Sequence, residues 1–167
     1  MKRSALLSLV ALLCVQPAWA QNADVKRYVR EHQPAILREF LELVAIPNVQ
    51  TDRVNIARNA EQLRGMLERR GMHPEVWETP STPMVYGEKL VPGAKKTLLF
   101  YLHYDGQPVD KSRWKQPDPF QPVLRAGTLE DGAAEIRDIA GRSSFPDDWR
   151  IYARAAGDDK GAIQSLV

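Results

Sequence analysis

The order of apolar and polar residues predicts an α/β sandwich, in which helices cover both faces of a largely parallel sheet. Helical patterns come first along the chain, strand patterns follow, and a further strand-to-helix step occupies residues 149–167. The run "TLLFYL" at residues 97–102 is apolar on both faces, which is typical of a central strand buried between two layers. A length of 167 residues and a hydrophobic content of 44% suit one soluble globular domain.

The first twenty residues, "MKRSALLSLVALLCVQPAWA", differ from the rest of the chain. They have a basic start, an apolar stretch at residues 5–15 and a small-residue end, which together predict a secretory signal peptide over residues 1–20. Cleavage after Ala20 would deliver the remainder, residues 21–167, to the periplasm or the medium. The alternative is a membrane anchor, but the apolar stretch is short against the ~20 residues of a span, so we expect no stable anchor.

Removing this segment changes the charge and the cysteine content. The formal net charge of +2 becomes zero, because residues 1–20 carry two basic and no acidic side chains. A neutral chain without a basic patch gives no support for nucleic-acid binding. The single cysteine, Cys14, is also removed, which excludes a disulfide, thiolate catalysis and cysteine-ligated zinc from the mature chain.

Two helices are expected before the strands. The first begins after Asp24, which can cap it, and extends toward Ile46, with Pro34 predicting either a kink or two separate helices. The second begins near residues 51–52 and ends at Gly71, where a glycine suits the left-handed backbone of a helix end.

Short, half-polar stretches at residues 75–79 and 84–88 predict edge strands, and residues 97–102 predict the central one, with Phe100 and Tyr101 in the core. A long, proline-containing connection over residues 106–148 follows, and connections of this length are usually functional or disordered. A further strand is expected at residues 149–154. The last helix is expected to begin near Lys160 and to run to the end of the sequence without a stop signal, as in a chain cut within an element.

Polar side chains follow two of the predicted strands at the point where each ends. His103 and Asp105 come after residues 97–102, and Asp158 and Asp159 come after residues 149–154. Neighbouring parallel strands deliver their carboxyl ends to one crevice. Imidazole and carboxylate are zinc ligands, so we expect His103 to bind one ion, Asp105 to orient its ring, and Asp158 to bridge two ions.

Each motif also has a purely structural interpretation. A His-x-Asp sequence is often a satisfied surface or core pair, and Asp-Asp-Lys before a helix is often a solvated N-cap. Their shared position at strand ends, on either side of a long loop, favours the metal site. The other two histidines, His32 on a helical stripe and His73 before a proline, are expected to be structural or exposed.

Three blocks in order, "LLFYLHYDGQPVD", "WKQPDPFQPVL" and "IYARAAGDDKGAI", resemble the amino-terminal half of the two-zinc peptidase family of aminoacylase, glutamate carboxypeptidase and carnosinase-type dipeptidases. "LELVAIPNV" is similar too, and the resemblance covers residues 25–167. It implies an α/β three-layer sandwich with a mostly parallel mixed sheet, present here as its amino-terminal portion. It also implies that His103 is a ligand of one Zn²⁺, Asp105 the supporting catalytic aspartate and Asp158 the bridging ligand of two Zn²⁺ ions.

The resemblance has departures. Ala153 and Ala155 flank Arg154 where the family has glycines, so the local turn is expected to differ. The family's Glu-Glu pair with the general base, a further acidic ligand, a late histidine and a lid domain that forms homodimers in many relatives all lie beyond the blocks present.

The sequence thus predicts the amino-terminal part of an exported zinc-dependent metallopeptidase. The complete enzyme would hydrolyse amide bonds of dipeptides or of C-terminal or acylated amino acids, and the resemblance implies a homodimer. This part alone is expected to be inactive and to bind zinc weakly. The alternative is a non-catalytic periplasmic binding or interaction module on the same scaffold.

Overall fold

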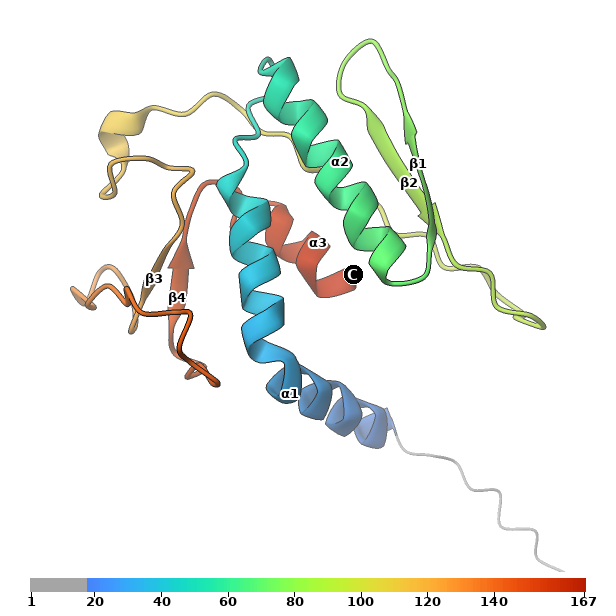
Figure 1. Cartoon of the computed structure of the whole chain (residues 1–167), viewed down its shortest axis with the longest axis horizontal. Helices are drawn as coiled ribbons and strands as arrows, with labels where there is room; N and C mark the ends of the chain where they lie inside the picture. Colours follow the sequence, from blue (N-terminus) through green and yellow to red (C-terminus); the bar gives the residue numbers. More distant parts are fainter. Residues whose placement is uncertain (1–17) are drawn as a thin grey trace, which may run out of the picture. The chain divides into compact units, whose positions relative to one another are not determined.

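The computed structural model describes residues 18–167, so most of the predicted signal peptide, residues 1–20, lies outside the described residues. The chain divides into two units, Met1–His32 and Gln33–Val167. Within residues 18–167, none of the helices combines the length and the apolar character that crossing a bilayer requires. Helices and small antiparallel sheets make up the described chain (Figure 1), so the predicted mixture of helix and strand is confirmed at that level.

Helix α1, Ala18–Ala45, is one continuous helix with Pro34 inside it. Of the two outcomes expected at Pro34, separate helices are therefore excluded. In the first unit, the predicted stripe at Val25, Tyr28 and Val29 is exposed. The His32 ring stacks on the Tyr28 ring with centroids 4.0 Å apart, which agrees with the structural role expected for this histidine.

The second unit contains the core. Helix α2, Arg53–Arg69, begins where Asp52 accepts a hydrogen bond from the Asn55 amide and ends before Gly71, whose φ of 70° is left-handed. Both ends agree with the prediction, because capping residues are local signals. The core contains one face of α2 and side chains from α1, α3 and the segment around Tyr104: Leu43, Ile56, Ala60, Leu63, Met66, Tyr104 and Ile163.

Strands β1, His73–Trp77, and β2, Met84–Glu88, form an antiparallel hairpin that packs on α2 (Figure 1). After the short 3₁₀ helix η1, Lys111–Arg113, a second antiparallel pair joins β3, Val123–Arg125, to β4, Arg150–Tyr152. Strand β4 confirms the strand predicted at residues 149–154. Helix α3, Lys160–Leu166, begins at the predicted residue.

The predicted central strand is not formed. Residues 97–102 carry no strand pairing, and the side chains of Leu98, Leu99, Phe100 and Tyr101 are exposed, so the core positions predicted for Phe100 and Tyr101 are wrong. The physical reason is a lack of partners: the described strands pair only within β1–β2 and β3–β4. The parallel pairing found among the described residues is one isolated bridge between Val49 and Gly106, so no parallel sheet covers the apolar run.

Candidate metal site

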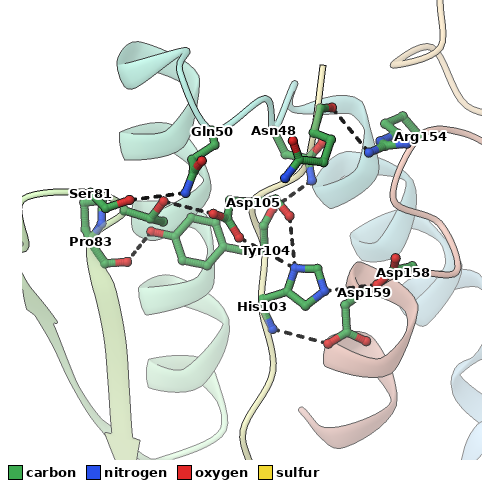
Figure 2. A network of polar contacts seen from close by, with 12 residues as sticks. Asn48, Gln50, Ser81, Pro83, His103, Tyr104, Asp105, Arg154, Asp158 and Asp159 are labelled. Atoms are coloured by element: carbon green, nitrogen blue, oxygen red, sulfur yellow. Dashed lines mark hydrogen bonds and ion pairs between the residues drawn. The ribbon is translucent and has the colours of Figure 1, made fainter. Parts of the chain in front are cut away.

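The structure brings His103, Asp105 and Asp158 together in one place (Figure 2). His103 Nε2 lies 3.0 Å from Asp158 Oδ1, and the backbone N–H of His103 donates to Asp159 Oδ2 over 3.2 Å. The segment with His103 therefore contacts the turn before α3 through the carboxylates of both Asp158 and Asp159. This convergence was predicted, although it occurs without the sheet edge that was expected to produce it.

The His103 ring lies between two hydrogen-bond acceptors. Its Nδ1 is 3.0 Å from the carbonyl oxygen of Asp105, and its Nε2 faces the Asp158 carboxylate. A carbonyl oxygen can only accept, so Nδ1 carries a proton and directs the lone pair of a neutral ring to Nε2. The Nε2 atom can then contact the Asp158 carboxylate in two ways. Either the ring is protonated and Nε2 donates a hydrogen bond, or a metal ion takes the place of that proton.

The pKa of His103 is affected by opposing influences. Burial alone would lower it, but the Asp105 carbonyl and the charges of Asp158 and Asp159 outweigh burial and raise the pKa above its ordinary value. A cluster of carboxylates that favours a positive charge on this ring also favours a metal cation at the same position.

Asp105 holds the ring in a different way from the one expected. Its carboxylate Oδ1 is 3.6 Å from His103 Nδ1, too far for a good hydrogen bond, whereas its backbone carbonyl accepts the proton. The other carboxylate oxygen accepts from the Thr82 hydroxyl at 3.1 Å. Asp105 thus orients the ring through its backbone, and its side chain is fixed by the loop between β1 and β2.

Asn48 and Gly106 fix the segment of residues 103–106, and neither was expected from the sequence to belong to the site. Asn48 donates from Nδ2 to the carbonyl of Tyr104 over 2.9 Å. The Asn48 carbonyl in turn accepts from the Gly106 amide over 2.7 Å, which anchors both sides of Asp105. A Cβ on Gly106 would lie 3.1 Å from Asn48 Nδ2, so this close approach favours glycine. The Asn48 position could have been suspected only from its place just after Ile46-Pro47.

The turn before α3 has an alanine, Ala155, in a backbone conformation that glycine usually adopts. Ala155 has a φ of 66°, a left-handed conformation that a Cβ disfavours, and Ala153 is buried. The Arg154 amide between them donates to the Pro119 carbonyl over 2.7 Å, which ties this turn to the long connection.

Two cavities adjoin the site. The first, of about 140 Å³, is lined by seven residues: Gln50, His103, Asp105, Gly106, Gln107, Arg154 and Asp158. The second, of about 310 Å³, is lined by six: Pro108, Val109, Asp110, Arg113, Trp114 and Arg154. Arg154 belongs to both linings.

The donor atoms fit a zinc ion. Two ligands of a tetrahedral zinc, each ~2.1 Å from the metal, are about 3.4 Å apart, and His103 Nε2 and Asp158 Oδ1 are separated by 3.0 Å. A shift of a few tenths of an ångström, within the freedom of the exposed Asp158 side chain, would admit the ion. Among residues 18–167, no group of three His, Cys, Asp or Glu side chains is arranged to hold a metal.

Comparisons with protein families, curated proteins and solved structures give no match to this chain. The assignment of the site therefore depends on its own geometry and on the three sequence blocks.

Proposed function

We propose that His103 and Asp158 are zinc ligands of a two-zinc metallopeptidase that hydrolyses amide bonds of dipeptides or of C-terminal or acylated amino acids. The observation that supports this most directly is the His103 ring, whose Nδ1 is committed to the Asp105 carbonyl while its Nε2 faces the Asp158 carboxylate at 3.0 Å. A backbone carbonyl on the far nitrogen of a histidine is the usual arrangement behind a metal ligand.

Each residue has a definite task in this proposal. His103 offers the Nε2 lone pair, the Asp105 carbonyl fixes the tautomer, and Asp158 offers a carboxylate whose side chain is 92% exposed and so can reach a second ion. Bound zinc would supply Lewis acidity toward an amide carbonyl. Asp105 keeps the imidazole in position while its side chain is held by Thr82.

The proposal includes the rest of the protein's organisation. We propose that residues 21–167 belong to an exported catalytic domain built as a three-layer sandwich with a mostly parallel mixed sheet, and that further acidic and histidine ligands and the general base come from outside the three blocks. The apolar, unpaired run at residues 97–102 supports this fold, because it offers open backbone groups to neighbouring strands.

Zinc titration of the metal-free chain tests the proposal, with affinity measured by competition against a chromogenic chelator. We expect weak 1:1 binding, because two protein ligands leave an ion largely hydrated. His103→Ala and Asp158→Asn should each lower the affinity at least tenfold, the usual scale for a lost ligand contact.

His73→Ala is the matched control, since His73 is an exposed histidine at the start of β1, and its zinc affinity should equal that of the unaltered chain. Equal affinity in His103→Ala would refute the metal site and leave a non-catalytic binding module as the better description.

A further inference from the structure

Arg154 lines both cavities and has few partners of its own. Its Nη2 makes one long hydrogen bond, 3.3 Å, to the Gln107 carbonyl (Figure 2). Its Nε is buried and has no hydrogen-bond partner. Among residues 18–167, no carboxylate is paired with this guanidinium, in contrast to Arg69 and Arg70, which both contact Glu39.

An arginine with unused hydrogen-bond donors and no paired carboxylate is suited to bind an anionic ligand. The guanidinium has five N–H donors in a planar fork, and its buried Nε without an acceptor is unfavourable for the fold unless a ligand supplies one. The backbone at Gly106 also allows this approach, because a Cβ there would lie 3.4 Å from Arg154 Nη2.

From these observations we propose that Arg154 binds the free carboxylate of the substrate. It would hold that group on the wall between the His103–Asp158 pair and the second cavity. The identity of the ligand as a substrate rests on the proposed peptidase function, whereas the anion site itself does not.

The charges around Arg154 select the kind of anion. Asp105 and Asp158 line the first cavity, and Asp110 lines the second together with Arg113. With three carboxylates around the two arginines, a singly charged carboxylate meets less repulsion than a doubly charged phosphate. A carboxylate also matches the two parallel donors of the fork.

The second cavity defines what the carboxylate is attached to. Pro108, Val109 and Trp114 form an apolar and aromatic part of its wall, Asp110, Arg113 and Arg154 form a charged part, and its volume of about 310 Å³ is at the small end for a ligand pocket. The expected ligand is therefore a small N-acylated amino acid or dipeptide with a free carboxyl-terminal carboxylate.

Binding of two probes to the metal-free full chain tests the inference. N-acetyl-L-alanine carries the carboxylate, and N-acetyl-L-alanine amide has nearly the same shape without the charge. Titrations followed by ¹H–¹⁵N NMR should show the acid binding at least tenfold more tightly than the amide, with shifts at Arg154 and its neighbours. Arg154→Gln should abolish this preference, and Arg154→Lys, which keeps the charge but not the fork, should retain part of it.

Arg137→Gln is the matched control, because it removes an exposed arginine that lines neither cavity, and it should leave the preference unchanged. A preference for the acid that survives Arg154→Gln, or tighter binding of inorganic phosphate than of the acid, would overturn the inference. If Arg154→Gln does not fold, a reduced preference in a folded Arg154→Lys, whether partly or wholly lost, supports the fork, and an unchanged preference contradicts it.

The same titration in His103→Ala separates this inference from the proposed function. The anion site should persist there, because it needs no metal. Loss of zinc binding with a preserved acid preference in His103→Ala is the result expected if both proposals hold. Preserved zinc binding in that variant contradicts the peptidase proposal alone, whereas an unaltered chain that binds zinc but shows no acid preference contradicts the Arg154 inference alone.

Discussion

Lys160 donates from Nζ to the carbonyl oxygen of Leu43 over 2.8 Å and so links the first residue of α3 to the last turn of α1. A second bond, of 2.7 Å, reaches the Ile46 carbonyl. The last carbonyls of a helix have no partner within it, and a basic side chain is a suitable cap for them. Lys160 is fully buried, and this burial lowers its pKa to about 7. The turn with Asp158 and Asp159 is thereby fixed to α1.

Lys160→Met should lower the free energy of unfolding by about 1–3 kcal/mol, because two buried carbonyls lose their donor while the side-chain volume is kept. The loss of stability is limited to this range because the variant no longer has to bury an amine. Urea denaturation at pH 7 measures it, and Lys115→Met, at an exposed position, should change the stability little. Equal stability of both variants would show that water replaces the Lys160 amine without penalty.

Glu39 should make stability depend on acid. Hydrogen bonds from Arg70 hold the pKa of Glu39 down to about 2 against the effect of burial, with help from Arg69 and Gln164. A carboxylate with a lowered folded-state pKa stabilises the fold above its ordinary pKa of 4.5, and this contribution is lost as the pH falls toward 2.

Glu39→Gln should therefore reduce stability by about 1–3 kcal/mol at pH 7, and the gap to the unaltered protein should close between pH 4.5 and pH 2. Denaturant titrations across this range measure the gap. Glu42→Gln, at an exposed position on the same helix, is the control and should give no comparable gap. A constant gap down to pH 2 would contradict the assignment.

Ala155→Gly should stabilise the protein. The φ of 66° at Ala155 strains a residue with a Cβ, at a cost of about 1–2 kcal/mol that glycine avoids, less the greater entropy of glycine in the unfolded chain. We expect a net gain of about 0.5–1 kcal/mol, seen as a higher midpoint in thermal unfolding. Ala156→Gly is the control at a neighbouring position for which no positive φ is found, and it should not be stabilising. A lower midpoint for Ala155→Gly would mean that the turn is not strained.

The exposed apolar run should cause self-association. Leu99 and Tyr101 are 87% and 88% exposed, beside Leu98 and Phe100, and an uncharged β-prone segment with open backbone groups pairs readily with another copy. Leu99→Lys should shift sedimentation toward smaller species. Val54→Lys changes an isolated exposed apolar residue on α2 and should not. The same association in Leu99→Lys and the unaltered chain would exclude the run as its cause.

Features set by local chemistry could be predicted from the sequence. Helix α2 begins and ends at Asp52 and Gly71 because caps and positive-φ glycines act within a few residues. The apolar pattern at residues 97–102 indicates that the segment would be stabilised by burial. It does not indicate whether partner strands are present to bury it. The prediction of a central strand was wrong for the described residues for that reason.

The candidate site could be predicted only in part, because local patterns identify its residues but not their geometry. His103 and Asp158 were paired because both follow apolar stretches and carry ligand-type side chains. The use of the Asp105 carbonyl instead of its carboxylate depends on a ring rotation that spacing does not specify. Lys160 was expected only to start a helix, and its burial follows from the position of α1, which no local pattern reports.

The contacts that hold the candidate site join parts of the chain that are distant in sequence. Asn48 reaches Tyr104 across 56 residues, His103 reaches Asp159 across 56, and Lys160 reaches Leu43 across 117. Such contacts require the closure of long loops, which is slow and entropically unfavourable before the core has formed. The His103 environment should therefore assemble late in folding, after α2 and its hairpin. The same contacts should open early under mild denaturant, so that ligand-binding geometry is lost while much of the helical signal remains.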